Sequence, residues 1–307
     1  MNMEIAKKVL ISGGSGLLGR RLTQILEQEG YEVAWLSRRG KFSGQKVFEW
    51  DIKAGRIDEA ALEWAGHILH LAGEGIADKR WTKPRKEELL LSRTMPGELL
   101  KKKIEERGGF QGRIICASAV GYYGATTSEH VFSETDEGGS DFMADVCRKW
   151  EASSTNLIQK ATGGGAILRI GIVLSADGGA LPKLALPVKY YVGSSLGSGK
   201  QMIPWIHIDD VCRMFLHCLK NKDCKGIYNA TGPQSVRHDT LIKCIGDVLS
   251  RPVFLPHVPE FVLKAMLGEM SVMVTAGVAV SSERIRMSGF SYLYPDLFSA
   301  LRKELIK

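Results

Sequence analysis

Short apolar runs alternate with amphipathic stretches along the first half of the chain. The runs predict strands, and the stretches between them carry apolar residues at helical spacing. The predicted strands cover residues 9–11, 32–36, 46–50, 67–71, 113–117 and 166–170. Strands that alternate with helices are joined by right-handed crossovers, so the pattern predicts an α/β fold of the Rossmann type, with a doubly wound parallel sheet.

The first strand runs through a glycine turn directly into a helix. Apolar side chains repeat at helical spacing from Leu18, and the helix is expected to stop at Gly30. This order of strand, turn and helix predicts a dinucleotide site, with the pyrophosphate at the positive end of the helix. The residues expected to form the site are Gly13, which allows the tight turn, Ser15, Gly16, which lets backbone N–H groups approach the phosphates, Leu17, Leu18 and Gly19, which packs the helix on the sheet.

The identity of the dinucleotide is decided where the second strand ends. NAD-binding proteins usually place a carboxylate there, which binds the ribose 2′-hydroxyl. This chain has Ser37, Arg38 and Arg39 instead. Because a guanidinium group suits a 2′-phosphate, the sequence predicts NADP, with Ser37 and Arg38 in the cofactor site. The alternative is a pair of solvated arginines in a surface loop.

The alternation of strands and helices changes after about residue 170. A stretch rich in Gly and Ser occupies 193–199, and the segment PWIHIDD occupies 204–210. We expect an NADP-binding domain over residues 1–170 and a smaller α/β lobe over 171–307, with residues of about 200–232 as candidates to return to the first domain. Asp209 or Asp210 is expected to cap a helix over 211–219, and His207 is expected to bond locally.

Composition is that of an ordinary globular protein. The 307 residues are 44% hydrophobic and 24% charged, with a formal net charge of +7 and a pI near 9.0. The densest basic runs, 79–86 and 101–103, are interleaved with or flanked by other residue types. This spacing favours a cation-rich surface that attracts anionic small molecules over a nucleic-acid site.

Cysteine usage indicates a reducing compartment. The six cysteines form no C-x-x-C pair, and several lie in apolar patterns, which predicts buried reduced thiols and no metal site. No signal peptide and no apolar run long enough to cross a bilayer is recognised. We therefore expect a cytoplasmic protein with no membrane partner.

Four further segments, together with the glycine turn, resemble a known family. They are Leu71-Ala72-Gly73-Glu74 after the fourth strand, Ser118 through Tyr122-Tyr123-Gly124 after the fifth, Lys149-Trp150-Glu151-Ala152, and Gly197-Ser198-Gly199-Lys200-Gln201 through Asp209. The chain resembles the extended short-chain dehydrogenase/reductases, and more narrowly their atypical branch of epimerase family proteins with a distinctive C-terminal domain. The resemblance covers essentially the whole chain. It adds Leu71, Ala72, Gly73 and Glu74 to the expected cofactor site.

The resemblance also implies a catalytic set, and the chain matches this set only in part. In the family a Ser or Thr polarises the substrate oxygen, and a Tyr with a Lys four residues later transfers the proton. Ser118 fits the hydroxyl role, although Ala119 occupies an alternative alignment. Lys149 lies in the expected helix, but Asp145 stands four residues before it. The proton-transferring tyrosine is therefore absent from its usual place.

Three explanations of this absence stay open. Tyr122 or Tyr123 takes the proton-transfer role beside Ser118 and Lys149, or Asp145 serves as the acid or base. Alternatively, the domain binds NADP without turnover, as a sensor or scaffold. The leading hypothesis is an NADP-dependent epimerase-like oxidoreductase that acts on a hydroxyl or carbonyl substrate, with a nucleotide sugar as one candidate. Lys200 and Gln201, after the Gly/Ser-rich stretch, are candidates to bind an anionic group of that small molecule. A monomer or a homodimer is expected, with no nucleic-acid partner.

Overall fold

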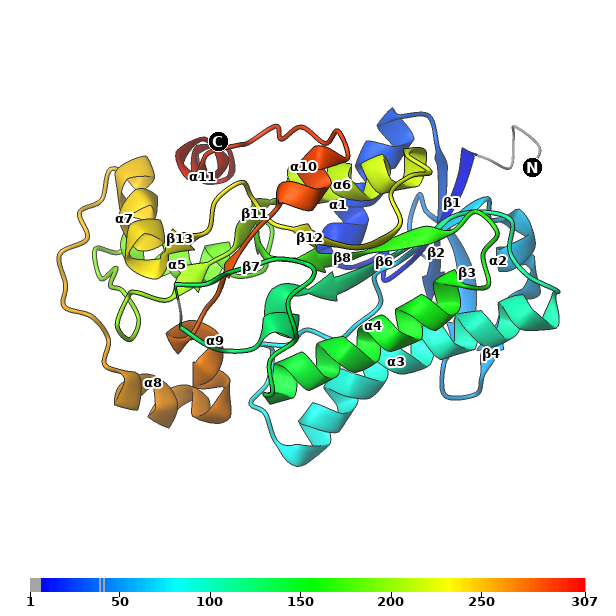
Figure 1. The fold of residues 1–307 in the computed structure, drawn as a ribbon. Coiled ribbons are helices and arrows are strands. Elements are labelled where there is room, and N and C mark those ends of the chain that lie inside the picture. The colour runs from blue at the N-terminus through cyan, green and yellow to red at the C-terminus, as the bar shows by residue number, and fades with distance from the viewer. Residues whose placement is uncertain (1–6, 39, 41, 128, 307) are drawn as a thin grey trace.

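The computed structural model describes residues 7–38, 40, 42–127 and 129–306. At its centre lies an eight-stranded sheet of order β12-β8-β6-β5-β1-β2-β3-β4 (Figure 1). The strands are β1 (Lys8–Ser12), β2 (Glu32–Ser37), β3 (Lys46–Asp51), β4 (Arg56–Ile57), β5 (His67–His70), β6 (Ile114–Ala119), β8 (Gly165–Ile170) and β12 (Gly226–Ala230). All neighbours pair in parallel except β3 and β4. The predicted Rossmann-type sheet is confirmed.

Helices cover both faces of this sheet because side chains alternate between the faces along each buried strand. Helices α1 (Leu17–Gln28) and α6 (Ile208–Lys220) pack with Val9 and Ile11 on one face. On the other face Leu10 packs with residues of α2 (Glu59–Trp64), α3 (Lys83–Glu106) and α4 (Phe142–Ile158). The long helices α3 and α4 run side by side below the sheet in Figure 1.

A second lobe lies at the left in Figure 1 and has its own core. Trp205, Leu241 and Leu301 are among the buried residues that join its elements. The elements beyond the sheet are the short helix η2 (Val120–Tyr123), β7 (Val131–Phe132), β9 (Ile172–Leu174), α5 (Leu181–Lys189), β10 (Met202–Ile203), β11 (Trp205–His207), β13 (Val236–Arg237), α7 (His238–Leu249), α8 (Glu260–Leu267), η3 (Gly268–Ser271), α9 (Val272–Thr275), β14 (Ala279–Val280), α10 (Glu283–Met287) and α11 (Leu297–Leu305).

One segment of the second half of the chain lies in the sheet layer. Strand β12 pairs with β8, and α6 packs against α1. Residues of α10 also contact β12. The domain division at residue 170 stays a prediction.

The expected cap of α6 is wrong. The helix begins at Ile208, and the Nδ1 atom of His207 accepts a hydrogen bond from the backbone N–H of Asp209 at 3.1 Å. The two aspartates instead form long-range contacts: Asp209 pairs with Arg21 of α1 at 2.5 Å, and Asp210 accepts hydrogen bonds from the N–H groups of Leu293 and Tyr294. Because the His207 ring caps the start of the helix, the carboxylates of Asp209 and Asp210 are free to bond to other segments.

No helix in the described part of the chain combines the length and the apolar character needed to cross a membrane.

Candidate functional site

The glycine turn after β1 closes too tightly for side chains. Gly13 has a φ of 79°, and a Cβ there would lie 3.0 Å from backbone atoms of Leu71 and Ala72. A Cβ at Gly19 would lie 2.5 Å from the carbonyl oxygen of Gly13. A larger residue at Gly13 would push the turn away from Leu71 and Ala72, and one at Gly19 would push the helix off the turn. The backbone geometry that a pyrophosphate needs therefore depends on these two glycines.

The N-terminus of α1 keeps its backbone donors available. Gly16 precedes the helix and supplies no side-chain cap, and the first turn contains no acidic residue. The N–H of Gly16 donates to the carbonyl of Gly13 at 3.1 Å and fixes the turn. The next N–H groups, of Leu17, Leu18 and Gly19, lie at the positive end of the helix dipole, where an anion is stabilised. The predicted residues from Gly13 to Gly19 thus form a cradle that fits a dinucleotide.

An ion pair reaches across this turn. Arg38, which follows β2, donates to Glu74, which follows β5, at 3.3 Å between Nη2 and Oε1. The two strands flank β1, so the pair joins the segments on either side of the glycine turn. The side chain of Arg38 is 72% exposed. An exposed pair of this kind contributes at most about 1 kcal/mol, so a phosphate can displace Glu74 at little cost. Arg39 lies outside the described residues.

The segment after β5 is fixed by a buried arginine of α3. Arg93 donates to the carbonyl oxygen of Glu74 at 2.9 Å, and Ser92 accepts from the N–H of Glu74 at 3.2 Å. Burial lowers the pKa of Arg93, whose guanidinium also lies over the ring of Trp150. This support holds Leu71 through Glu74 beside the glycine turn. Arg93 is not recognisable as a site residue from the sequence, because it lies within a helix rather than after a strand.

Ser118 is part of a buried ionic network. Its Oγ donates to the carboxylate of Glu151 on α4 at 2.7 Å, and Arg169 of β8 donates to both oxygens of the same carboxylate at 2.8 Å. The three residues are 2%, 5% and 1% exposed. Burial opposes the charge on Arg169, but its hydrogen bonds to Glu151 raise the pKa of the guanidinium above its usual value. The network uses the hydroxyl that was expected to hold a substrate oxygen; a catalytic role for Ser118 stays a prediction that this geometry does not favour.

Tyr123 extends the same network to β12. Its hydroxyl accepts from Arg169 at 3.0 Å and lies 2.7 Å from Oδ1 of Asn229 and 2.9 Å from the carbonyl oxygen of Ser133. Ser118, Arg169 and Asn229 are register partners on three neighbouring strands, which explains why their side chains meet. Burial raises the pKa of Tyr123 to about 12. A group buried and bonded in this way is poorly suited to proton transfer near neutral pH.

Tyr122 has a different environment. Its ring lies over the Arg169 guanidinium, 3.4 Å from the ring centre, and it is partly exposed. The ring packs against the loop at Gly138, where a Cβ would lie 3.0 Å from the ring carbon that bears the hydroxyl. No hydrogen bond to this hydroxyl is found among the described residues. Of the two predicted tyrosines, Tyr122 is therefore the one with an uncommitted hydroxyl.

Lys149 and Asp145 pair with each other on an exposed face of α4. Their Nζ and Oδ2 atoms lie 2.8 Å apart, and their side chains are 54% and 43% exposed. The helix instead turns Met143 and Cys147 toward η2: a Cβ at Gly121 would lie 3.6 Å and 3.5 Å from them. These two residues have the four-residue spacing of the family's Tyr and Lys. Burial raises the pKa of Cys147 to about 12, so neither of them replaces the missing proton carrier.

The Gly/Ser-rich stretch is tied into the second lobe by Gln201. This buried amide donates to the carbonyls of Leu196 and Val274 at 2.9 Å and 2.7 Å. The N–H of Gly197 donates to the carbonyl of Val258 at 2.9 Å. Gln201 therefore holds the loop in place, and Lys200 remains the exposed candidate for an anion.

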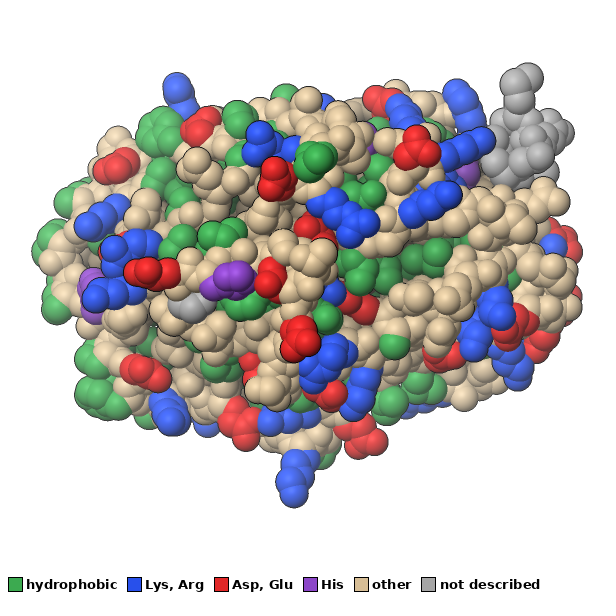
Figure 2. Space-filling model, in the orientation of Figure 1, with side chains coloured by type: hydrophobic (Ala, Val, Ile, Leu, Met, Phe, Trp, Pro, Cys, Tyr) green, Lys and Arg blue, Asp and Glu red, His purple; other side chains and the backbone are tan. Residues whose placement is uncertain are grey.

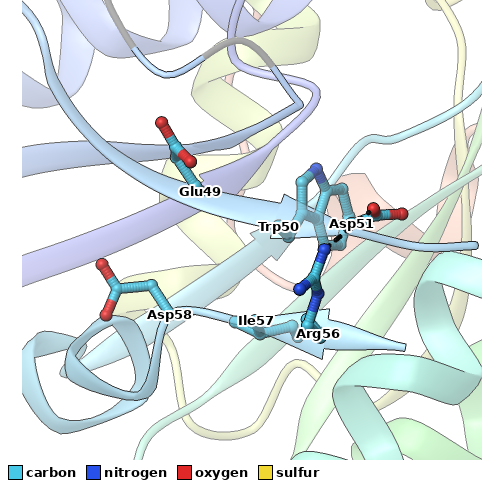
Figure 3. A pocket seen from close by; sticks show the side chains of 6 residues that line it. All are labelled: Glu49, Trp50, Asp51, Arg56, Ile57 and Asp58. Carbon is cyan, nitrogen blue, oxygen red and sulfur yellow. Dashed lines mark ion pairs between the residues drawn. The ribbon is translucent and has the colours of Figure 1, made fainter. Parts of the chain in front are cut away.

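An open hollow of about 470 Å³ lies along the β3–β4 hairpin, where its lining residue Glu49 pairs in register with Ser37 of β2 (Figure 3). Its lining residues are Glu49, Trp50, Asp51, Arg56, Ile57 and Asp58. Arg56 pairs with Asp51 at 3.5 Å, and the described lining residues include no further cation beside Glu49 and Asp58. The hollow is thus acidic and contains none of the predicted site residues.

Charges are mixed on the face of the molecule shown in Figure 2. Lys and Arg side chains alternate there with Asp and Glu, and no continuous basic stripe crosses this face. The expectation that no nucleic acid binds stays a prediction.

The fold and the glycine turn define the class of protein. A parallel sheet whose first strand leads through a tight glycine turn to an uncapped helix N-terminus is a dinucleotide-binding α/β protein. Residues 9–144 match the NAD dependent epimerase/dehydratase family, and residues 258–304 match a domain of unknown function, DUF1731. The chain belongs to the epimerase family proteins of the extended short-chain dehydrogenase/reductase type.

Relatives of known name agree over nearly the full length. The chain is 35% identical to "Epimerase family protein SDR39U1 homolog, chloroplastic" of Arabidopsis thaliana, over 96% of this chain and 85% of that protein. The crystal structure of human epimerase family protein SDR39U1 (isoform2) with NADPH is similar at a TM-score of 0.86 and 30% identity, over 97% and 98% of the two chains. The nucleoside-diphosphate sugar epimerase from Corynebacterium glutamicum gives a TM-score of 0.77 and 28% identity, over 97% of this chain and 58% of that one.

Proposed function

We propose that the protein binds NADP(H) in the cradle between Gly13 and Gly19. The observation that carries this proposal is Arg38, an exposed guanidinium where NAD-binding proteins have a carboxylate. Its ion pair with Glu74 is weak enough to be exchanged for a 2′-phosphate. The NADPH in the crystal structure of the human relative supports the same cofactor.

The bound cofactor would accept a hydride from a hydroxyl-bearing carbon when it is oxidised, or donate one to a carbonyl carbon when it is reduced, as in an epimerase-like oxidoreductase. Tyr122 is the proposed proton carrier, because its hydroxyl is uncommitted while those of Ser118 and Tyr123 are bonded within the network. Arg169, which lies against the Tyr122 ring, positions that ring. A nucleotide sugar is the proposed substrate class, supported by the similarity to the Corynebacterium protein, which is named a nucleoside-diphosphate sugar epimerase.

A second candidate function is cofactor sensing without turnover. It is favoured by Met143 and Cys147, which occupy the positions of α4 that face η2 with the family's Tyr–Lys spacing. In this alternative the occupied cofactor site signals to a partner protein, and Tyr122 packs on Arg169 without reacting.

Calorimetric titration with NADPH and NADH, at one fixed salt concentration, tests the cofactor. Loss of the Arg38 guanidinium should remove about 1.5–3 kcal/mol of charge-assisted hydrogen bonding. Arg38→Ala is therefore expected to weaken NADPH binding roughly 10- to 150-fold and to leave NADH binding unchanged. Arg56→Ala is the matched control, because Arg56 is a similarly exposed arginine in an ion pair on the β3–β4 hairpin. Equal affinity for both cofactors, or binding of neither, would contradict the proposal.

Turnover is tested by following NADPH absorbance, starting from NADPH with ketones and aldehydes and from NADP+ with nucleotide sugars, and by analysing the sugars for an inverted centre. The oxidoreductase proposal expects NADPH to be consumed or formed, or a sugar to be epimerised, with at least one of these classes, and this turnover should be abolished in Tyr122→Phe while NADPH binding is retained. A cofactor-bound protein that is inert toward the whole panel, with Tyr122→Phe indistinguishable from the native chain, would overturn it in favour of sensing.

A further inference from the structure

Two buried thiols lie together at the end of α6. Cys218 is in the last turn of the helix, and Cys224 follows the turn that leads to β12. That turn is closed by the N–H of Cys224, which donates to the carbonyl of Asn221 at 3.2 Å. Both thiols are free and 0% exposed, and each is the largest single influence on the pKa of the other. A helix end and a tight turn thus bring two cysteines six positions apart into one buried cluster.

A buried cation holds the backbone of this pair. The guanidinium of Arg113 donates to the carbonyl of Cys218 at 3.0 Å and to the carbonyl of Cys224 at 2.5 Å. Its further hydrogen bonds go to the carbonyls of Gly163 and Lys222. All four acceptors are neutral, so the positive charge of Arg113 is not cancelled by a bonded carboxylate and favours a thiolate nearby.

The two thiols differ in their readiness to ionise. The neighbouring Cys218 is the largest influence on Cys224 and lowers its pKa, and Ser288 and Tyr228 act in the same direction. Cys224 in turn raises the pKa of Cys218. The Cys224 sulfur is thus the nucleophile, and Cys218 remains a thiol until Cys224 has reacted.

We propose that Cys218 and Cys224 form a redox-active dithiol that a peroxide converts to an intramolecular disulfide. The Cys224 sulfur attacks one peroxide oxygen, the O–O bond breaks, and a sulfenic acid and one water form. The Cys218 sulfur then attacks the sulfenic sulfur, the S–O bond breaks, and the thiol proton leaves with the hydroxyl as a second water. Two thiols are oxidised by two electrons, and one peroxide is reduced to two waters.

Access for the oxidant comes through the surface turn. Asp223 and Lys225, on either side of Cys224, are exposed, so Cys224 lies directly beneath the surface. Opening of this four-residue turn, which the Cys224 N–H closes, would bring its sulfur to solvent without unfolding α6 or β12.

Peptide mapping of the full native chain tests the proposal. The protein is treated at pH 7 with one equivalent of hydrogen peroxide, free thiols are blocked with iodoacetamide, and trypsin is added without reductant. Cleavage after Arg213, Lys220, Lys222 and Lys225 separates the two cysteines into the peptides 214–220 and 223–225. A disulfide-linked pair of these peptides, lost on reduction, is expected to be the main oxidation product.

Cys244→Ser is the matched control, because Cys244 is the partly exposed cysteine and lies on α7 in the second lobe. This variant should give the linked peptides in the same yield. In Cys218→Ser, Cys224 should instead accumulate as a sulfenic acid, trapped by dimedone. The proposal is overturned if Cys244 is oxidised while Cys218 and Cys224 are recovered alkylated. It is also overturned if the link forms only after the chain is unfolded in urea. Cofactor binding enters neither readout, so the result is independent of the proposed function.

Discussion

The polar groups at the strand ends have opposite surroundings in the two halves of the central sheet. Around β1 and β2 the helix N-terminus is uncapped and Arg38 lies exposed in a weak ion pair. Around β6, β8 and β12 the polar side chains at the strand ends bond to each other beneath the surface. The first half keeps its donors for a ligand, while the second uses them within the fold.

This difference separates cofactor binding from catalysis. A dinucleotide needs backbone donors and one cation, which the first half offers without rearrangement. Proton transfer needs an exposed acid or base, and in the second half only the Tyr122 hydroxyl is uncommitted among the described groups of the predicted catalytic set. The backbone donors and the cation that would bind a cofactor are thus available, whereas most groups of the predicted catalytic set are bonded within the fold. The buried network around β6, β8 and β12 should therefore contribute measurably to stability.

The largest effect is expected from Glu151→Gln. The substitution removes the negative charge but leaves Arg169 1% exposed and without a bonded carboxylate. Breaking a buried ion pair in this way should lower the free energy of unfolding by about 3–5 kcal/mol. Urea denaturation followed by circular dichroism measures it.

Asp145→Asn is the control on the same helix. It breaks the pair with Lys149, whose side chains are about half exposed, and should cost less than about 1 kcal/mol. If the two variants lose the same free energy of unfolding, the ion pair of Glu151 and Arg169 behaves like an exposed one. The difference drawn between the two halves of the sheet would then be wrong.

The parts of the fold and site that could be predicted from the sequence are those that depend on neighbouring residues. The glycine turn spans Gly13 to Gly19, and Arg38 directly follows its strand, so both were placed correctly from neighbouring residues. Six strands of the sheet were predicted to within two residues at each end, because buried parallel strands are continuous apolar runs, whereas β4 and β12 were not predicted.

The buried network of Ser118, Glu151 and Arg169 could not be predicted from neighbouring residues. Its contacts depend on the register of the strands and on which side of α4 each residue faces. Ser118 bonds to a residue 33 positions away, and Arg169 to the same residue 18 positions away. Lys149 follows Cys147 by two residues, which rotates it by roughly 200° around the helix to the exposed face. One signal was present: Arg169 is a charge inside the apolar run 166–170, and a buried arginine needs hydrogen-bond acceptors nearby, among which a carboxylate also balances its charge.

A smaller loss of stability is expected when the pH is lowered, because of a buried polar pair beneath the glycine turn. Ser12 and His70, at the ends of β1 and β5, lie 2.6 Å apart between Oγ and Nδ1, and both are 0% exposed. Burial lowers the pKa of His70 to about 4 from 6.5. The unfolded chain therefore binds more protons between these values, and stability is lost as the pH falls through that window. By pH 5 His70 should contribute a loss of about 2 kcal/mol.

Unfolding measured at pH 7 and pH 5 in the native chain and in His70→Asn tests this contribution. The variant should show a smaller difference between the two pH values, whatever its stability at pH 7. Burial likewise lowers the pKa of His238 to about 4, so some pH dependence should remain. His257→Gln, which changes an exposed histidine, is the control. An unchanged difference in His70→Asn would show that His70 is not held neutral in the fold.

The smallest effect is expected from Ser118→Ala, and it bears most directly on catalysis. Arg169 already donates to both oxygens of Glu151, so the carboxylate stays paired when the Ser118 hydroxyl is removed. Loss of one buried hydrogen bond should cost about 1 kcal/mol and leave NADPH affinity unchanged. A Ser118 that polarises a substrate oxygen would behave differently: Ser118→Ala would keep its stability and lose its turnover with any substrate found. Unfolding and turnover measured on the same preparation distinguish a hydroxyl used by the fold from one used by the reaction.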